Sequence, residues 1–338
     1  MRNILYTLII IVILFPASFL VEEKVVPTEI KESEFVTLVF AGDIMLDRGV
    51  RKSVVKNFSN DYSALFAQEE VSSIFKKSDI VFANLEGPVS DKGVDRKNLY
   101  SFRMDPAILP ALKNAGIDIV SVANNHAGDW GQAAYIDTLA RLKENGILYT
   151  GGGLDKTETE IPVTIEKNGL KIGFLGFSDK GPDYLTTNGG KAGVLLANDP
   201  NFDVIISSAA QQVDYLIVSF HFGEEYVKEH NARQEYLAHR AIDNGAKIVI
   251  GHHPHVIEDT EMYSRKSCTQ SSCMSYIAYS LGNFLFDQSW SAPTMEGMIL
   301  QLKLFRDGSI SATKNNVYLN SFFQLERMEK VQEEVLRF

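Results

Sequence analysis

Cysteine is scarce in this 338-residue chain, which has only Cys268 and Cys273, separated by four residues in a polar, serine-rich stretch. The pair has no third cysteine and no histidine beside it, which argues against a cysteine-based metal site. In an oxidising compartment the two thiols would close a small disulfide loop. Such a short loop removes little entropy from the unfolded chain, so it would stiffen a turn more than stabilise the fold. The alternative is two unpaired surface thiols.

Positive charge is also in deficit. The chain has 33 lysines and arginines against 43 aspartates and glutamates, a formal net charge of −10. A strongly acidic protein repels nucleic acid and anionic lipid at long range, so binding an extended polyanion would need a local basic patch or bound cations. We therefore exclude nucleic acid as a partner. A hydrophobic fraction of 45% with 22% charged residues predicts a globular chain with a sizeable core. We find no internal repeat, no low-complexity tract and no boundary to a second domain.

Long apolar runs are limited to one, at residues 4–21. Its length, about 18 residues, lies between a signal-peptide core and a minimal membrane-spanning helix, and either would export the rest of the chain. Residues 17–19, Ala-Ser-Phe, lack the small third residue of a cleavage site, which favours an uncleaved anchor in the cell membrane over a secreted protein. A buried core helix is disfavoured because the run has no polar face. We assign residues 1–21 to this segment and 22–34 to a polar linker.

Past the linker, short β-like runs alternate with helical patterns. The runs are rich in Val, Ile, Leu, Phe and Tyr and end at Gly, Asn, His or Ser, which is typical of buried strands. They are residues 35–41, 80–83, 117–123, 171–177, 215–220, 247–250 and 276–281.

Helical periodicity and a final hairpin complete the expected fold. Residues 132–145 and 233–244 have apolar side chains on one face and stop at a glycine, as amphipathic helices do. The alternation predicts an α/β fold built from βαβ units. Residues 298–323 predict two antiparallel strands around an Arg-Asp-Gly turn. We therefore expect one domain at 35–325 and a tail at 326–338.

Five polar motifs in this domain each follow an apolar run. In open α/β sheets, ligands collect outside the carboxyl ends of the strands, so groups distant in sequence converge there if their strands are neighbours. We expect the motifs to bring oxygen and imidazole donors together around a cation. They are Gly42-Asp43-Ile44-Met45, Asn84-Leu85-Glu86, Asn124-Asn125-His126, His221-Phe222-Gly223-Glu224-Glu225 and Gly251-His252-His253-Pro254-His255.

Histidines dominate the last motif. Pro254 biases the residue before it toward extended geometry, in which side chains two apart lie on the same side. His253 and His255 are therefore expected to face one site as a chelating pair, whereas His252 is expected to point away and to pack or hydrogen-bond elsewhere. His221 also follows an apolar strand, and its alternative role is an ordinary polar residue at a strand end.

Oxygen donors complete the expected ligand set. Asp43 follows Gly42, whose missing side chain permits a tight strand exit and a close backbone approach. A carboxylate is a hard ligand and imidazoles suit Zn, Mn, Fe or Ni, so the mixed set indicates a transition metal. Asn125 offers a carbonyl oxygen, and His126 suits a general acid that protonates a departing oxygen. The alternative for this Asn-Asn-His motif is a turn with capping side chains.

In this order the motifs resemble the signatures of a known family. With Arg48 after the first motif, and with Ser280-Leu281-Gly282-Asn283-Phe284 and Asp287 after the last, the chain is similar to the CapA family of poly-γ-glutamate capsule biosynthesis proteins, also called PgsA. The resemblance covers roughly residues 35–287. It implies a four-layer α/β/β/α sandwich of the calcineurin-like metallophosphoesterase type.

Roles carry over from that fold type to the positions that match its motifs. The catalytic residues are then His126 and Asp43, and the cofactor is one or two divalent ions of Mn, Zn or Fe. The implied metal ligands are Asp43, Glu86, Asn125, His221, His253 and His255.

Two positions depart from the wider phosphoesterase pattern. Met45 stands where a histidine is expected, and a soft thioether is a poor ligand for hard divalent ions. Glu86, or less favourably Asn84, stands near the place of a bridging aspartate. The number of metal ions is therefore left open.

A bound cation would polarise a phosphoryl or acyl oxygen and activate a water for in-line attack, while His126 protonates the leaving group. Arg48 and Arg103 are candidate anion clamps, since guanidinium forks suit phosphate and carboxylate; the alternative for each is a surface charge. Glu225 and Asn283 would orient histidine ligands from behind, or serve as loop hydrogen-bonding residues.

Two function classes stay open. The first is an extracytoplasmic metal-dependent hydrolase of phosphoesters or polymer linkages. The second is a non-catalytic accessory of capsule assembly or export that holds polymer in the metal cleft. The expected partners are an anionic polymer or phosphoester substrate, the membrane through the N-terminal segment, and subunits of a capsule synthase. A plain secreted binding domain would require every polar motif to be turn chemistry.

Overall fold

The computed structural model describes residues 35–187, 190–266 and 274–336. The expected anchor at 1–21, the linker at 22–34 and both cysteines lie outside these ranges. In the described part of the chain, no helix has the length and apolar character needed to span a membrane.

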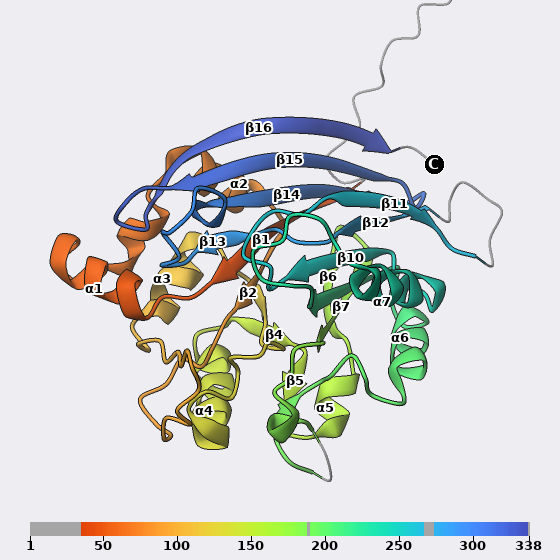
Figure 1. The fold of residues 1–338 in the computed structure, drawn as a ribbon. Coiled ribbons are helices and arrows are strands. Elements are labelled where there is room, and N and C mark those ends of the chain that lie inside the picture. Colours follow the sequence, from red (N-terminus) through yellow and green to blue (C-terminus); the bar gives the residue numbers. More distant parts are fainter. Residues whose placement is uncertain (1–34, 188–189, 267–273, 337–338) are drawn as a thin grey trace, which may run out of the picture. The chain divides into compact units, whose positions relative to one another are not determined.

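The larger sheet in the described residues has eight strands, in the order β16-β15-β14-β1-β2-β3-β4, with β13 paired to β1 (Figure 1). Strands β2, β3, β4 and β13 extend the sheet in parallel with β1, whereas β14, β15 and β16 are antiparallel additions. The bounds are β1 Phe35–Ile44, β2 Ile80–Leu85, β3 Ile119–Ser121, β4 Leu148–Thr150, β13 Asn283–Leu285, β14 Glu296–Phe305, β15 Ile310–Leu319 and β16 Leu325–Leu336.

The second sheet in the described residues has six strands, in the order β11-β12-β10-β9-β7-β6. Its four inner strands are parallel, and β11 and β6 are antiparallel edges. The bounds are β6 Val163–Lys167, β7 Leu170–Ser178, β9 Tyr215–His221, β10 Ile248–His252, β11 Thr260–Ser264 and β12 Met274–Ala278, with a separate ribbon of β5 Gly152–Gly153 and β8 Gly193–Val194.

Helices connect the strands. The predicted helices at 132–145 and 233–244 are confirmed as α4 Gly131–Glu144 and α7 Ala232–Asp243. The other helices are α1 Arg48–Asn57, α2 Glu69–Lys77, α3 Ile108–Ala115, α5 Lys156–Glu160 and α6 Phe202–Ala210, with 3-10 helices η2 Tyr62–Phe66, η3 Asp183–Leu185 and η5 Pro293–Met295.

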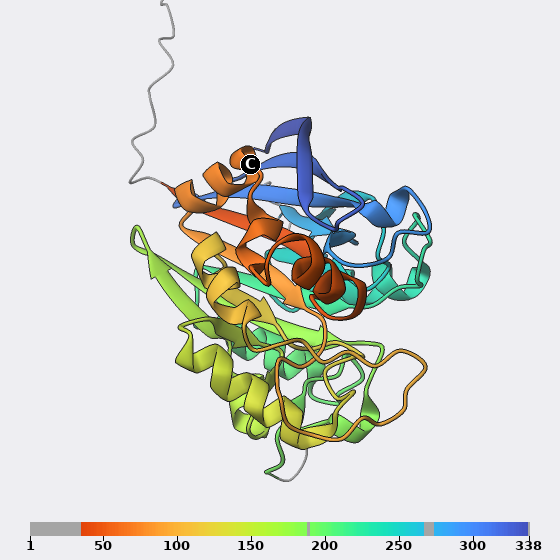
Figure 2. The same ribbon diagram turned by 90° about the vertical axis from the view of Figure 1, so that its left-hand side faces the viewer.

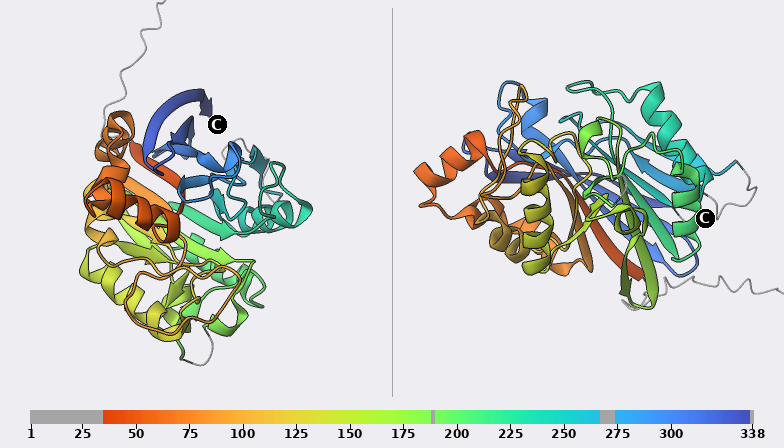
Figure 3. Two further views of the ribbon diagram at one scale, coloured as in Figure 1. Left: turned by 60° about the vertical axis from the view of Figure 1, so that its left-hand side comes forward. Right: turned by 90° about the horizontal axis from the view of Figure 1, so that it is seen from below.

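Strand residues alternate between separate hydrophobic cores. In β1, Val39 and Ala41 pack in a core with α1 to α4, whereas Leu38 and Phe40 pack against the second sheet. A third core joins the second sheet to α6 and α7. Because side chains alternate along a strand, a strand that is apolar on both faces is buried on both faces. The layers are therefore helices, sheet, sheet and helices, and the views in Figures 2 and 3 show helices on opposite sides of the strands.

The expectation of a C-terminal tail at 326–338 is wrong. Residues 325–336 form β16, which pairs antiparallel with β15 along its length and makes one edge of the larger sheet. Its segment 326–330, Glu-Arg-Met-Glu-Lys, is mostly charged, so it lacks the apolar signal of a buried strand. Charged side chains are a common means of protecting an edge strand from pairing with another chain.

A buried carboxyl near the start of α7 gives the fold a pH dependence. Glu258 is 3% exposed, accepts a 2.6 Å hydrogen bond from Gln234 Nε2 and has no hydrogen-bond partner for Oε1 among the described residues. Burial, aided by the charges of Asp259 and Glu229, raises its pKa from 4.5 to about 8. The folded protein then holds a proton that the unfolded chain has released, so the contribution of Glu258 to stability falls as pH rises from 4.5 to about 8.

Replacing Glu258 by glutamine should therefore raise the melting temperature at and above pH 8, with a difference from wild type that shrinks toward pH 4.5. Glutamine cannot ionise, and its carbonyl can accept the same bond from Gln234. Thermal unfolding across this pH range measures the effect. Parallel pH profiles for the two proteins would contradict it.

Candidate functional site

The polar motifs meet at the carboxyl ends of parallel strands in both sheets. In the larger sheet Asp43 is in register with Asn84 and with Asn283. In the second sheet His252 is in register with His221. Gly42 allows this packing, because a Cβ at that position would lie 2.0 Å from the carbonyl oxygen of Gly282. The strand ends of the two sheets therefore bring these groups together.

Asp43 is the fully buried anion of the cluster. Its Oδ1 accepts from Asn84 Nδ2 at 2.8 Å and lies 3.2 Å from His252 Nδ1. Its Oδ2 lies 3.4 Å from His255 Nδ1 and accepts from the backbone N–H of His253 at 3.3 Å. Burial alone would raise the pKa of this carboxyl, but hydrogen bonds and charge from His252 and His255 outweigh it and hold the pKa well below its usual range.

Glu86 lies between two histidines. Its Oε1 is 3.6 Å from His255 Nε2 and 3.8 Å from His126 Nε2, and burial raises the pKa of its carboxyl well above the usual range. The other nitrogen of His126, Nδ1, lies 2.8 Å from Asp129 Oδ2, and the ring stacks on Phe102 with centroids 3.9 Å apart. The contact with buried Asp129 places a proton on Nδ1 of His126, and the position of the ring directs Nε2 toward Glu86.

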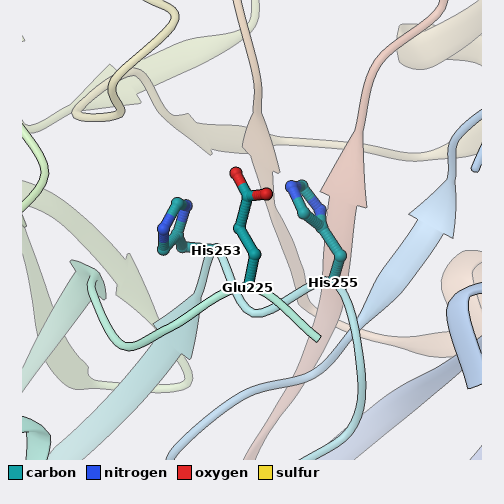
Figure 4. Close-up of side chains that lie close together, drawn as sticks. All are labelled: Glu225, His253 and His255. Atoms are coloured by element: carbon teal, nitrogen blue, oxygen red, sulfur yellow. The ribbon is translucent and has the colours of Figure 1, made fainter. Parts of the chain in front are cut away.

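The remaining ligand candidates lie close to one another and to His255. His221 Nε2 is 2.8 Å from Asn125 Oδ1, and the His221 ring centroid is 4.8 Å from that of His253. Glu225, expected to orient a histidine from behind, instead has its carboxylate between the rings of His253 and His255, with one donor atom from each residue within 4.8 Å of the others (Figure 4). Glu225 is exposed, so it closes the cluster on the solvent side.

Two expectations about the histidine motif are wrong. His252 does not point away from the cluster: its ring lies between the sheets, 6.1 Å from the ring of Phe82, and reaches Asp43. The backbone is not extended either, since φ is +101° at His253 and +59° at His255. The bias imposed by proline is overridden here, where the His253 N–H donates to Asp43. The two rings still come within 6.0 Å between centroids.

The imidazoles differ in charge. Burial, followed by the charges of neighbouring histidines, lowers the pKa of His221 and of His253 well below the usual value. Burial also opposes protonation of His255, but Glu86 and Asp43 outweigh it and raise its pKa to about 9. His221 and His253 are thus neutral at pH 7, the form in which imidazole coordinates metal.

The two arginines expected to clamp an anion are engaged elsewhere. Arg48 forms an ion pair with Asp287, and its guanidinium lies over the ring of Phe102 at 4.7 Å. The guanidinium of Arg103 stacks on Trp130 at 3.5 Å and is 3.4 and 3.5 Å from two backbone carbonyl oxygens. The contacts therefore tie both side chains to neighbouring loops.

Met45, one of the two departures from the phosphoesterase pattern, has a packing role. Met45 is fully buried in a small apolar cluster with Phe102 and Phe286, so it supports the ring beneath His126.

Asn283, expected to orient a histidine, has Oδ1 3.0 Å from His255 Nδ1. Its Nδ2 donates to a buried side chain and a buried carbonyl, which fixes the amide orientation.

Buried polar atoms in the cluster fit a bound cation. Glu86 Oε1, His253 Nδ1 and His252 Nε2 are buried without hydrogen-bond partners among the described residues, whereas His252 Nδ1 has its contact with Asp43. Unpartnered buried donors and acceptors are costly and call for an ion or water. The donor set of carboxylate oxygens and imidazole nitrogens suits Mn, Zn or Fe. In the described residues, the groups with mutually close donor atoms are Asp43, Glu86 and His255, and Glu225, His253 and His255.

Two residues of the site carried no strong sequence signal. Asp129 follows His126 by three residues in a turn, a spacing that could have suggested the pair. Lys180 lies two residues beyond the end of β7, and its charge is close enough to His253 to contribute to the lowered pKa. No pattern in the sequence marks Lys180, because its place in the site depends on how β7 and β9 pair.

The chain matches the family described as bacterial capsule synthesis protein PGA_cap over residues 37–288. It is 33% identical over 311 residues to the capsule biosynthesis protein CapA of Bacillus anthracis, covering 89% of this chain and 72% of that protein. It is 30% identical over 306 residues to the PGA biosynthesis protein CapA of Bacillus subtilis (strain 168), covering 89% and 76%. A crystal structure of the calcineurin-like phosphoesterase YfkN from Bacillus subtilis is similar with a TM-score of 0.47 and 15% identity, over 90% of this chain and 91% of that one. The family match over most of the chain, together with these two relatives, shows that this protein belongs to the bacterial capsule synthesis family PGA_cap.

Proposed function

We propose that this protein is an extracytoplasmic, metal-dependent hydrolase of the phosphoesterase type that acts in the synthesis or export of a poly-γ-glutamate capsule. The observation that carries the proposal is the buried group of Asp43, Glu86 and His255, with His126 beside it and held by Asp129. The similarity to a capsule biosynthesis protein and a PGA biosynthesis protein supports the capsule context, and the apolar run at 4–21 supports the expected export.

Different residues of the cluster would bind the metal and donate the proton. Asp43, Glu86, Glu225, His253 and His255 would hold one or two divalent ions. A bound ion of this kind lowers the pKa of a coordinated water and polarises an oxygen of the substrate. With Nδ1–H held by Asp129, His126 in its imidazolium form would give the Nε2 proton to the departing oxygen and become the neutral imidazole. Phe102, stacked on His126, limits the movement of that ring.

A non-catalytic role in polymer assembly is the second candidate. It is favoured by Met45, which stands where the phosphoesterase pattern has a histidine and is buried with Phe102 and Phe286. In this case the cluster would hold polymer carboxylates through the cation. Binding would then need metal and would weaken as salt concentration rises.

Elemental analysis of the purified full-length protein, followed by assay with an artificial phosphodiester, separates these candidates. We expect bound Mn, Zn or Fe, turnover that a chelator removes, and a lower melting temperature after chelation, since an ion that binds only the folded state stabilises it. Bound metal without turnover, whichever ion is supplied, would favour the assembly role. A protein that binds no metal would contradict both.

A further inference from the structure

Lys180 projects from the carboxyl end of β7 beside the histidine cluster. Ser178 ends β7 in register with His221, and the N–H of Asp179 donates to the carbonyl oxygen of His221 at 2.9 Å. Lys180 Nζ lies 3.0 Å from Oε1 of Glu224, the residue before Glu225. Lys180 therefore lies on the same sheet edge as the candidate ligands.

The base of the Lys180 side chain is held in place by its neighbours. Ser178 Oγ donates to the carbonyl oxygen of Gly181 at 2.5 Å and accepts from the Lys180 N–H at 3.3 Å. Asp179 forms an ion pair with Arg233, near the start of α7, at 2.6 Å. The turn is braced on both sides, so Lys180 is presented from a fixed position.

The ion pair of Lys180 with Glu224 is more exposed than the contacts of Arg48 and Arg103. The Glu224 side chain is 68% exposed, and exposed ion pairs contribute little to stability. Arg48, in contrast, is paired with the largely buried Asp287, and Arg103 is stacked on Trp130. An incoming oxyanion could replace Glu224 at Lys180 at little cost, but it would have to break a partly buried pair to reach Arg48.

We propose that Lys180 binds an anionic oxygen of the substrate, from a phosphate or a carboxylate, next to the metal-binding cluster, and that Glu224 occupies Lys180 until substrate binds. This inference rests on the proposed function, because it identifies a specificity-determining residue of the same site. Phosphate and the free carboxylates of a γ-linked glutamate chain present the same oxyanion chemistry, and the experiment below distinguishes them.

The two partners should have opposite effects on affinity. Lys180→Met removes the cation and should weaken oxyanion binding about 10-fold, a typical effect for a hydrogen bond to a charged group. Glu224→Gln removes the competing carboxylate and should strengthen binding of the same probe. Lys180→Arg keeps the charge and should restore most of the affinity. A merely structural contact between Lys180 and Glu224 would give the same sign for both variants.

Calorimetric titration of Mn-loaded full-length protein with inorganic phosphate, and separately with a γ-linked glutamate oligomer, measures these affinities. Lys77→Met, an exposed lysine at the end of α2, is the matched control and should leave both unchanged. Metal content and melting temperature are checked for every variant. A loss in Lys180→Met for one probe or both, with a gain in Glu224→Gln, supports the proposal and identifies the source of the oxyanion.

Two results would overturn the inference. Wild-type affinity for both probes in Lys180→Met, while wild-type turnover of the phosphodiester is intact, removes the role of Lys180 and leaves the proposed function standing. Wild-type protein that contains no metal, turns over no phosphodiester and binds neither probe overturns the proposed function and this inference together.

Discussion

Replacing Asp43 by asparagine is expected to abolish stoichiometric metal binding and to lower kcat/KM for a phosphodiester by at least about 100-fold. Asp43 is fully buried, and the low pKa of its carboxyl keeps it negatively charged. It contacts His252, His255 and Asn84, so it is the charge around which the donors are arranged. Asparagine has nearly the same shape but no charge, which separates the electrostatic effect from a packing defect.

The amide of asparagine would also create a conflict of donors. At present Oδ1 accepts from Asn84 and Oδ2 accepts from the backbone N–H of His253. Asparagine can satisfy only one of these donors with its oxygen, and its NH2 group would face the other. We therefore expect Asp43→Asn to lose the increase in melting temperature that added metal gives the wild type.

Asp118→Asn is the matched control for this experiment. Asp118 accepts a hydrogen bond from the N–H of Val81 at 3.1 Å. It lies near the amino ends of β2 and β3, at the opposite end of the strands from the candidate site. The Asp118→Asn variant should bind metal and turn over the phosphodiester like the wild type, with only a small loss of stability. Metal stoichiometry by elemental analysis is the decisive measurement, and a full complement of metal in Asp43→Asn would show that the cation is held elsewhere.

The convergence of the motifs could be predicted from sequence because it follows from strand order. The runs before Asp43, His221 and His252 are apolar and contain β-branched residues, so they predict buried parallel strands. Parallel strands end at one edge of the sheet, and the polar residues that follow them must therefore be neighbours. The antiparallel hairpin of β14 and β15 was predictable for the same reason, together with its Asp-Gly turn.

Local backbone geometry at the histidines could not be predicted in this way. The rule for residues before proline is a conformational bias, and His253 departs from it with φ +101°. Its N–H donates to a carboxylate 210 positions earlier in the chain. The engagement of Arg48 by Asp287 is equally distant, across 239 positions. Neither contact leaves a periodic or compositional trace, so both require the folded structure.

Alanine at His126 should retain metal and still lower kcat by about 10² to 10⁴-fold for an ester with a poor leaving group. Nε2 of His126 lies 3.8 Å from Glu86 Oε1, and His126 belongs to neither of the two groups of close donor atoms. The substitution therefore removes a proton donor and leaves both groups of candidate metal ligands complete. For p-nitrophenolate, which leaves without protonation, the loss should be much smaller. The ratio of the two losses is the measurement, because a packing defect would slow both esters equally.

Asp129→Asn tests how His126 is held. Asp129 is buried, contacts Nδ1 of His126 and accepts from the N–H of Phe102 at 2.8 Å. The asparagine amide could instead donate to Nδ1, which would favour the tautomer with its proton on Nε2 and remove the negative charge that stabilises the imidazolium. We expect unchanged metal content and a loss in kcat that depends on the leaving group as it does in His126→Ala. If Asp129→Asn slows the esters of good and poor leaving groups by the same factor, then Asp129 acts on the fold of the loop and not on the proton of His126.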